Sequence, residues 1–236
     1  MNHPQPSFSF ELFPPKTPEG LTKLSASIDR MNAVGPEYFS VTYGAGGSTR
    51  DCTFAALDLL LAKGIAAAPH LACIGSSRAE VRAILDRYRA QGIRRLVALR
   101  GDLPSGMGLG TSGDFRYANE LVSFIRQETG DHFRLEVAAY PEVHPQAANA
   151  DQDLANFQRK VAAGANAAIT QYFYNADAYF AFVDRCAGRG IKIPILPGIM
   201  PITNFSQLAR FSDACGAEIP RWLRKRLEAM GDDIEA

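Results

Sequence analysis

The chain has 236 residues, a mass of 25.7 kDa, 47% hydrophobic residues and equal numbers of basic and acidic side chains, 25 of each. Zero formal charge argues against a nucleic-acid or anionic-membrane binder, and the apolar content excludes an intrinsically disordered chain. No apolar run approaches the roughly 18 residues that cross a bilayer and no signal-peptide layout is present, so we expect a cytoplasmic globular protein without nucleic-acid or membrane partners.

Short β-rich runs alternate with amphipathic helical patterns along the chain. The runs predicted as strands are Ser7–Phe13, Tyr38–Tyr43, Ala66–Cys73, Arg95–Arg100, Arg134–Tyr140, Ala167–Tyr174 and Lys192–Ile199. Their nearly continuous apolar character is typical of strands that are covered on both faces of a parallel sheet.

The helical patterns between these strands have recognisable ends. Ser77 and Glu80 form a capping box, and Gly92 stands where that helix should stop. After the seventh strand, two further helical stretches are predicted at Asn204–Cys215 and Ile219–Met230.

Seven successive βα units predict an α/β protein with the (β/α)8 TIM-barrel fold, formed by one catalytic domain that spans residues 1–236. A closed eight-strand barrel needs about 30 further residues, which is the typical length of one more unit. We therefore expect that the eighth βα unit is missing from this chain.

Polar residues gather where the predicted strands end. Glu11, His70, Asp102, Tyr140 and Gln171 all lie at or near such ends. Because the active site of a TIM barrel lies at the C-terminal ends of its strands, these residues together predict a ligand site. His70 taken alone is as well explained as a buried structural histidine.

Two glycine-rich segments do not meet the requirements of nucleotide-binding motifs. Gly108–Gly113 matches G-x-G-x-x-G, but Asp102–Met107 separate it from the preceding strand, which favours a loop before a helix starting near Phe115. Gly44–Gly47 is followed by no Gly-Lys-Ser/Thr, so it is not a P-loop.

The four cysteines, Cys52, Cys73, Cys186 and Cys215, are widely spaced and match no metal-binding pattern. We expect reduced core residues and no metal site.

Five blocks of sequence resemble one family. They are Phe8-Ser-Phe-Glu-Leu-Phe-Pro-Pro-Lys16, Val41-Thr-Tyr-Gly-Ala-Gly-Gly-Ser-Thr-Arg50, Ala98-Leu-Arg-Gly-Asp-Leu-Pro104, Val137-Ala-Ala-Tyr-Pro-Glu-Val-His-Pro145 and Pro197-Gly-Ile-Met-Pro-Ile-Thr-Asn-Phe205. Together they resemble methylenetetrahydrofolate reductase, above all its bacterial FAD-dependent type, over essentially the whole chain. The resemblance implies a (β/α)8 barrel with FAD as cofactor, NADH or NADPH as reductant, a folate substrate and a homo-oligomer.

The same resemblance implies roles for individual residues. Glu11 would be the catalytic acid, and Asp102 would lie beside the flavin and also contact the folate. Gln171 would meet both the pterin and the nicotinamide, Gln207 would contact the folate, and either substrate would stack on Phe211.

The implied cofactor site draws on both halves of the chain. Thr42 would contact the nicotinamide. The remaining residues implied for this site are Tyr43, His70, Arg100, Gly101, Asp102, Tyr117, Ala118, Tyr140, His144, Pro145, Gln146, Ala147, Asp153, Asn156, Arg159 and Lys160. Gln146 stands where many relatives have Glu. Without the resemblance, Arg159 and Lys160 would be read as a solvated helix face.

The chemistry of the reaction agrees with these residue types. Reduction of 5,10-methylenetetrahydrofolate requires protonation of N10, which opens the imidazolidine ring and leaves an iminium on N5. The apolar setting of Glu11, between Phe and Pro residues, is predicted to raise the pKa of its carboxyl by desolvation. Asp102 would favour the cationic iminium. The two substrates would use the flavin in turn, which gives ping-pong kinetics.

Two alternatives stay open at this point. One is another flavin-dependent barrel oxidoreductase, for example of the proline-dehydrogenase kind, although amine oxidation has no ring-opening step that needs Glu11. The other is a non-catalytic flavin- or folate-binding barrel, which the absent eighth unit favours and the presence of Glu11, Asp102 and Gln171 disfavours.

Overall fold

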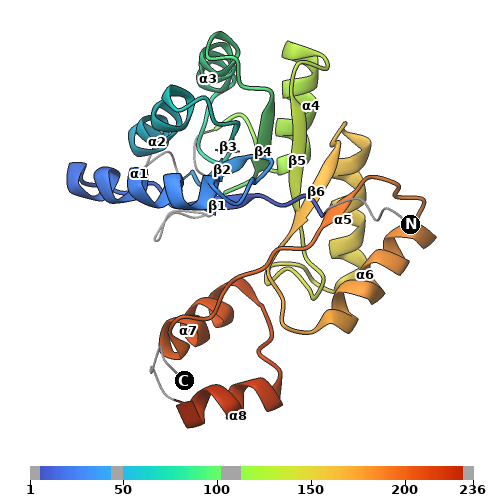
Figure 1. Ribbon diagram of the computed structural model, residues 1–236. Coiled ribbons are helices and arrows are strands. Elements are labelled where there is room, and N and C mark those ends of the chain that lie inside the picture. Colours follow the sequence, from blue (N-terminus) through green and yellow to red (C-terminus); the bar gives the residue numbers. More distant parts are fainter. Residues whose placement is uncertain (1–5, 44–49, 102–112, 231–236) are drawn as a thin grey trace, which may run out of the picture. The chain divides into compact units, whose positions relative to one another are not determined.

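The computed structural model describes residues 6–43, 50–101 and 113–230. Within these ranges the elements are β1 (Phe10–Leu12), α1 (Pro18–Asn32), β2 (Phe39–Val41), α2 (Arg50–Ala62), β3 (Ala67–Ala72), α3 (Arg78–Ala90), β4 (Arg95–Leu99), α4 (Ala118–Thr129), β5 (Arg134–Ala139), α5 (Ala150–Ala162), β6 (Ala167–Thr170), α6 (Ala176–Gly188), β7 (Ile195–Leu196), α7 (Phe205–Cys215) and α8 (Arg221–Met230) (Figure 1).

The strands follow one another in the sheet in chain order, and their pairing is parallel. Parallel strands that alternate with helices in this order form a TIM-barrel-like α/β fold, of which seven units lie in the described residues. The predicted fold class is therefore confirmed. All seven predicted strands are present, and each is shorter than predicted.

The predicted helix ends are also present. The Ser77 backbone N donates to Glu80 Oε2 at 2.8 Å and the Glu80 backbone N donates to Ser77 Oγ at 3.2 Å, which completes the capping box of α3. Gly92 follows that helix with a φ of 75°, a conformation that glycine adopts without strain. The helix expected near Phe115 begins three residues later, at α4, where Glu120 accepts a hydrogen bond from the Tyr117 backbone N.

Contacts divide the chain into two compact units, Met1–Glu136 and Val137–Ala236. In the first unit β5 begins beside β4, where the Arg134 backbone N donates to Arg94 O at 2.7 Å. Its core is built from leucine and isoleucine side chains that are almost fully buried, namely Ile28, Leu57, Leu60, Leu71, Leu85, Leu96, Leu121 and Ile125. Each such side chain contributes about 1.5–3 kcal/mol through its removal from water.

A buried ion pair lies near the beginning of β4 in the first unit. Glu136 is completely buried and accepts hydrogen bonds from Tyr38 Oη at 2.9 Å and from Arg95 Nη1 at 2.6 Å. Arg95 also pairs with Glu37 and lies over the Tyr38 ring. Because every partner in this group is satisfied, the buried charge is tolerated.

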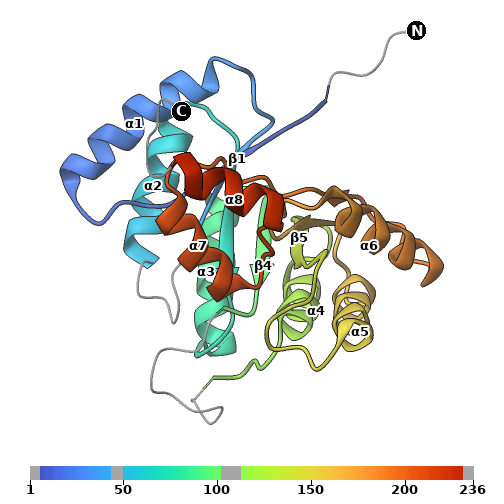
Figure 2. The same ribbon diagram turned by 90° about the horizontal axis from the view of Figure 1, so that it is seen from below.

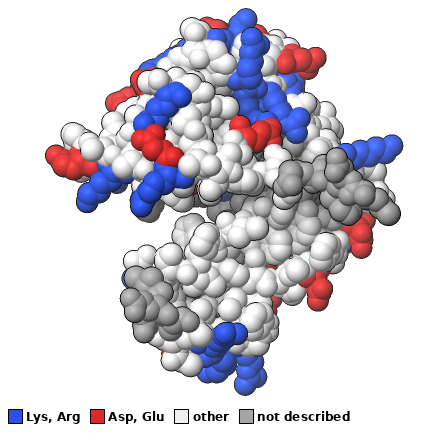
Figure 3. Space-filling model, in the orientation of Figure 1, with Lys and Arg blue, Asp and Glu red and all other residues white. Residues whose placement is uncertain are grey.

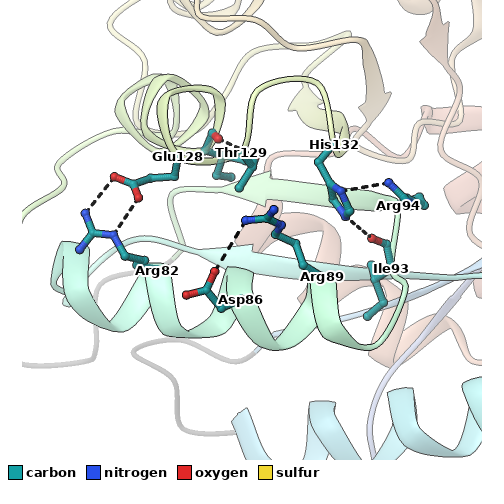
Figure 4. Close-up of polar contacts among 9 residues, drawn as sticks. Arg82, Asp86, Arg89, Ile93, Arg94, Glu128, Thr129 and His132 are labelled. Atoms are coloured by element: carbon teal, nitrogen blue, oxygen red, sulfur yellow. Dashed lines mark hydrogen bonds and ion pairs between the residues drawn. The ribbon is translucent and has the colours of Figure 1, made fainter.

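The surface of the first unit carries charges of both signs. Arg82 of α3 binds Glu128 of α4 through two hydrogen bonds, at 2.7 and 2.8 Å (Figure 4). Nearby, His132 Nε2 donates to Ile93 O at 3.2 Å while its Nδ1 accepts from Arg94 at 3.0 Å. Figure 3 likewise shows basic and acidic side chains close to one another over this unit.

The second unit contains the end of β5 and all later elements. Helices α5 and α6 lie side by side in both views, joined by the Phe157 and Phe182 rings, whose centres are 5.7 Å apart (Figures 1 and 2). Helices α7 and α8 share a separate apolar cluster centred on Tyr172, Leu208 and Ile219. This cluster attaches both helices to the chain that follows β6.

Several predictions fall on residues outside the described ranges, among them Asp102, Gly44–Gly47, and Gly108–Gly110 of the glycine-rich match. The four cysteines are free thiols, and Cys73 and Cys186 are buried as predicted. Among the described helices, none has the length and apolar character that crossing a bilayer requires.

Candidate active site

The carboxyl group of Glu11 lies beside a buried histidine in the first unit. Glu11 is the middle residue of β1, and His70 lies on β3. Glu11 Oε2 is 3.6 Å from His70 Nε2, and the Glu11 side chain is 45% exposed whereas that of His70 is 8% exposed. His70 Nε2 has no hydrogen-bond partner within the described residues. The pair therefore joins one solvent-accessible acid to one buried polar atom that is available to a ligand.

Burial shifts the pKa values of both groups toward their neutral forms. It lowers the pKa of His70 to about 4, so the imidazole is neutral at neutral pH. It raises the pKa of the Glu11 carboxyl, as the apolar sequence around that residue predicted. A carboxyl group with a raised pKa that stays accessible is suited to donate a proton.

The backbone around Glu11 and His70 is held tightly at the strand ends. The Thr42 backbone N donates to Leu12 O at 3.0 Å, and the Ile74 backbone N donates to Arg100 O at 2.8 Å. Gly101 has a φ of 85°, and a Cβ there would lie 2.9 Å from the Cβ of Ala72. The turn after β4 therefore needs glycine both for its conformation and for space.

The other predicted cofactor residues of the first unit differ from one another in how far they are buried. Burial raises the pKa of Tyr43. Tyr117 is the N-cap of α4 and is 58% exposed, and Ala118 is the first residue of that helix. Asp102, the second predicted catalytic residue, lies outside the described residues.

In the second unit, the segment after β5 is organised around His144. The Tyr140 and His144 rings meet edge to face with centres 4.5 Å apart. The His144 backbone N donates to Asp153 Oδ2 at 3.0 Å, and the Gln146 backbone N donates to His144 Nδ1 at 3.0 Å. Gln146 therefore supports this segment through its backbone. Ala147 does the same by donating its backbone N–H to His144 O at 2.8 Å.

The predicted diphosphate contacts on α5 occupy different environments. Arg159 Nη1 donates to Asn156 Oδ1 at 2.7 Å near the surface. Lys160 Nζ instead reaches into the unit and donates to Ala138 O of β5 at 2.5 Å. Burial lowers the pKa of Lys160 to about 8. Lys160 thus does not belong to a solvated helix face, the reading that the sequence without the resemblance favoured.

The predicted substrate contacts of the second unit lie directly after β6 and on α7. Gln171 follows the last residue of β6, and Gln207 and Phe211 belong to α7. Gln171 Oε1 accepts a hydrogen bond from the Tyr172 backbone N at 3.0 Å, so its Nε2 is the group it offers to a ligand. Phe211 is 47% exposed and stacks on Tyr172, with ring centres 5.8 Å apart and planes inclined by 13°. Gln207, also exposed, lies one helical turn before Phe211 on α7.

A small cavity of about 10 Å³ lies next to these residues, which is space for about one water molecule. Its lining includes Tyr140, Gln171, Tyr172 and Glu142. Glu142 Oε1 is buried without a hydrogen-bond partner among the described residues, and burial raises the pKa of this carboxyl.

The structure thus groups the described site residues by unit. Glu11 and His70 are neighbours in the first unit, and Tyr140 and Gln171 line one cavity in the second. Sequence reasoning missed Tyr172, which supports Phe211. No signal in the sequence marked it, since Tyr172 lies in a predicted apolar strand.

Comparison with known proteins gives one consistent family. A family model described as methylenetetrahydrofolate reductase matches residues 1–236. The 5,10-methylenetetrahydrofolate reductase of Escherichia coli (strain K12) is 45% identical over 232 residues, covering 98% of this chain and 76% of the relative. That of Salmonella typhimurium is 46% identical with the same coverage. Methylenetetrahydrofolate reductase (NADH) 1 of Arabidopsis thaliana is 39% identical, covering 98% of this chain and 41% of the plant protein.

A solved structure shares the fold at lower sequence identity. It is a protein from Clostridium thermocellum described as binding two copies of 5-methyl-5,6,7,8-tetrahydrofolic acid. The TM-score is 0.69 at 18% sequence identity, covering 97% of this chain and 77% of that one.

Proposed function

Because the chain belongs to the methylenetetrahydrofolate reductase family, we propose that it is a single-domain flavoenzyme that reduces 5,10-methylenetetrahydrofolate to 5-methyltetrahydrofolate. In this proposal NADH, or NADPH, is the reductant, and the two substrates use the site in turn with ping-pong kinetics. The name of the plant relative favours NADH. The proposed setting is the cytoplasm, with small-molecule ligands and a second copy of the chain as the partners.

The observation that carries the proposal is the Glu11–His70 pair. A carboxyl group whose pKa is raised by burial keeps its proton to higher pH, and 45% of the Glu11 side chain is accessible to a substrate. His70 adds no positive charge at neutral pH, since burial lowers its pKa to about 4. A cationic neighbour would instead favour the carboxylate and remove the proton that the reaction needs.

The proposed role of Glu11 is to protonate N10 of the folate. That proton transfer opens the five-membered ring and leaves a cationic iminium at N5, which is then reduced. Asp102, if it lies close to this cation, stabilises it by its negative charge. In the second unit, Gln171 Nε2 donates a hydrogen bond to the bound ring system, and Phe211, supported by Tyr172, stacks on it.

The residues proposed for FAD agree with the chemistry of that group. His70 offers a buried nitrogen that has no hydrogen-bond partner among the described residues, and the Tyr140 and His144 rings offer apolar surface with polar edges. Arg159, near the surface of α5, is a cation of the kind that diphosphates bind. Lys160, proposed as a second contact, would have to leave its hydrogen bond to Ala138 O to reach the same group. When bound, FAD supplies the hydride transfer that amino acid side chains cannot perform.

The test uses Glu11→Gln, which removes the proton and keeps the size of the side chain. We expect flavin reduction by NADH to continue near the wild-type rate, whereas folate turnover falls by roughly 10²–10⁴-fold, the usual effect of losing a general acid. Glu19→Gln, a change to an exposed carboxylate in the first turn of α1, is the control and leaves both half-reactions unchanged.

Two outcomes would count against this role. Equal loss of both half-reactions in Glu11→Gln would make Glu11 a structural residue. Flavin that is bound by the wild type but never reoxidised by the folate would favour a different flavin enzyme or a binding module.

A further inference from the structure

Glu142 ties together two segments of the second unit that are far apart in sequence. It lies three residues after the end of β5, and its Oε2 accepts a hydrogen bond from the Glu218 backbone N at 2.7 Å. The two residues are 76 positions apart. A hydrogen bond with a charged acceptor is among the strong ones, so it fixes the link between α7 and α8 onto the end of β5.

The packing around this bond is tight on both sides. Gly216, at the C-terminus of α7, has a left-handed conformation with a φ of 73°. A Cβ there would lie 2.8 Å from Cγ of Pro145. Ala217 and Ile219, which flank Glu218, are buried in the cluster with Tyr172 and Leu208. The 216–219 segment is thus held by apolar burial and by the Ala217 backbone N–H, which donates to Ser212 O at 3.1 Å within the end of α7. The bond to Glu142 ties the same segment to the chain that follows β5.

This segment is continuous with the helix that carries two proposed substrate contacts. Gln207 and Phe211 are exposed residues of α7, and the helix ends at Cys215, directly before Gly216. Phe211 stacks on Tyr172, which itself lines the cavity beside Glu142. A shift of the 216–219 segment would therefore move α7 relative to β6.

The second carboxyl oxygen of Glu142 is buried, and among the described residues Oε1 has no hydrogen-bond partner. Glu142 and Gln171 line the same cavity of about 10 Å³. One water molecule fits this space and requires polar groups of this kind around it. Glu142 therefore contacts the α7–α8 link through Oε2, and its side chain lines the cavity that Gln171 also lines.

We propose that Glu142 is a positioning residue that locks α7 onto the end of β5 and thereby holds Gln207 and Phe211 where the folate binds. The lock itself is a property of the fold, whereas its effect on folate rests on the proposed function. Glu142 does not touch the reacting atoms in this account. It acts through the backbone of Glu218 and through the helix that ends beside it.

The lock is tested by hydrogen exchange of the Glu218 amide, which needs no substrate. In Glu142→Ala we expect this amide to exchange at least about tenfold faster than in the wild type, because its charged acceptor is lost. Glu142→Gln retains an oxygen acceptor, so protection returns toward the wild-type level. Glu218→Ala is the matched control, since it changes the side chain and leaves the backbone N–H in place.

Steady-state kinetics then test the effect on the substrate. We expect Glu142→Ala to raise the KM for methylenetetrahydrofolate by roughly tenfold, with the rate of flavin reduction by NADH preserved and with rescue in Glu142→Gln. Unchanged exchange of the Glu218 amide in Glu142→Ala would overturn the lock. Faster exchange with an unchanged KM would overturn the positioning role. If the wild type does not reduce the folate at all, the proposed function is wrong. The exchange rate of the Glu218 amide still shows whether Glu142 holds the 216–219 segment in place.

Discussion

The buried His70 gives the sharpest prediction about how stability depends on pH. In the folded protein burial lowers its pKa to about 4, whereas the ordinary value is 6.5. Between these two values the unfolded chain binds a proton that the folded protein does not bind. Stability therefore falls as pH decreases from about 6.5 to about 4, and the histidine makes no contribution above that window.

The size of the effect follows from the gap between the two pKa values. At about 1.36 kcal/mol for each pH unit, the gap between 6.5 and about 4 corresponds to about 3 kcal/mol of lost stability. Because a domain is typically stable by only about 5–15 kcal/mol, a loss of this size is easily measured. The raised pKa of Glu11 has the opposite effect on the free energy of unfolding. The folded protein holds this proton more tightly than the unfolded chain does, so the contribution of Glu11 to stability falls as pH increases.

The assay is urea denaturation of the wild type and of His70→Gln at several pH values from neutral down to about pH 5. Glutamine does not titrate, so the free energy of unfolding of the variant should fall less steeply with decreasing pH than that of the wild type. The difference between the two slopes approaches about 1.4 kcal/mol per pH unit. His132→Gln is the control, because it keeps His70 and with it the steeper slope. Parallel slopes for wild type and His70→Gln would refute the reasoning, since His70 would then accept a proton in the folded state.

Two further predictions concern stability at neutral pH. Glu136→Ala should lower the free energy of unfolding by about 1–3 kcal/mol, because it removes the buried acceptor of Tyr38 Oη and Arg95 Nη1 while Arg95 keeps its ion pair with Glu37. Glu136→Gln should cost less since it retains an acceptor, and equal urea midpoints for wild type and Glu136→Ala would contradict this. Gly198→Ala should cost about 1–3 kcal/mol or more, because its Cβ would lie 2.2 Å from Thr170 O. Gly188→Ala is the control, because Gly188 lies at the end of α6 with open space around it, and this change should be neutral or stabilising. Equal thermal midpoints for the two alanine variants would contradict the prediction, since the backbone near Thr170 would then accommodate the added Cβ without cost.

The fold could be predicted from the sequence largely because local signals agree with it. Apolar runs marked all seven strands, and the Ser77 capping box marked the start of α3. The lengths of the strands were predicted less well. The run Lys192–Ile199 shortens to β7, Ile195–Leu196, which lies between Pro194 and Pro197. Proline lacks the N–H that a strand ladder requires, so it limits pairing on both sides.

The prediction of where the sixth strand ends is wrong for a different reason. The run was predicted to continue to Tyr174, but β6 ends at Thr170. Tyr172 and Tyr174 turn instead toward the apolar cluster of α7 and α8, where Tyr172 is buried beside Leu208. An apolar pattern shows that a residue is buried, but it does not show which partner buries it.

The candidate site was predictable as a set of residues but not as a set of contacts. Strand ends carrying Glu11 and Gln171 are visible in the sequence because polar residues interrupt apolar runs there. The approach of Glu11 to His70 and the bond from Glu218 to Glu142 join positions far apart in the chain. Such contacts depend on tertiary packing and leave no periodic pattern in the sequence.

The central claim is that this chain carries electrons from a reduced nicotinamide to methylenetetrahydrofolate through bound FAD. The most direct measurement is the visible spectrum of the purified protein under anaerobic conditions, first alone, then with NADH, then with methylenetetrahydrofolate. We predict a flavin spectrum that NADH bleaches and that the folate restores, with 5-methyltetrahydrofolate as the product. A protein that binds no flavin, or a bleached flavin that the folate does not reoxidise, would contradict the account.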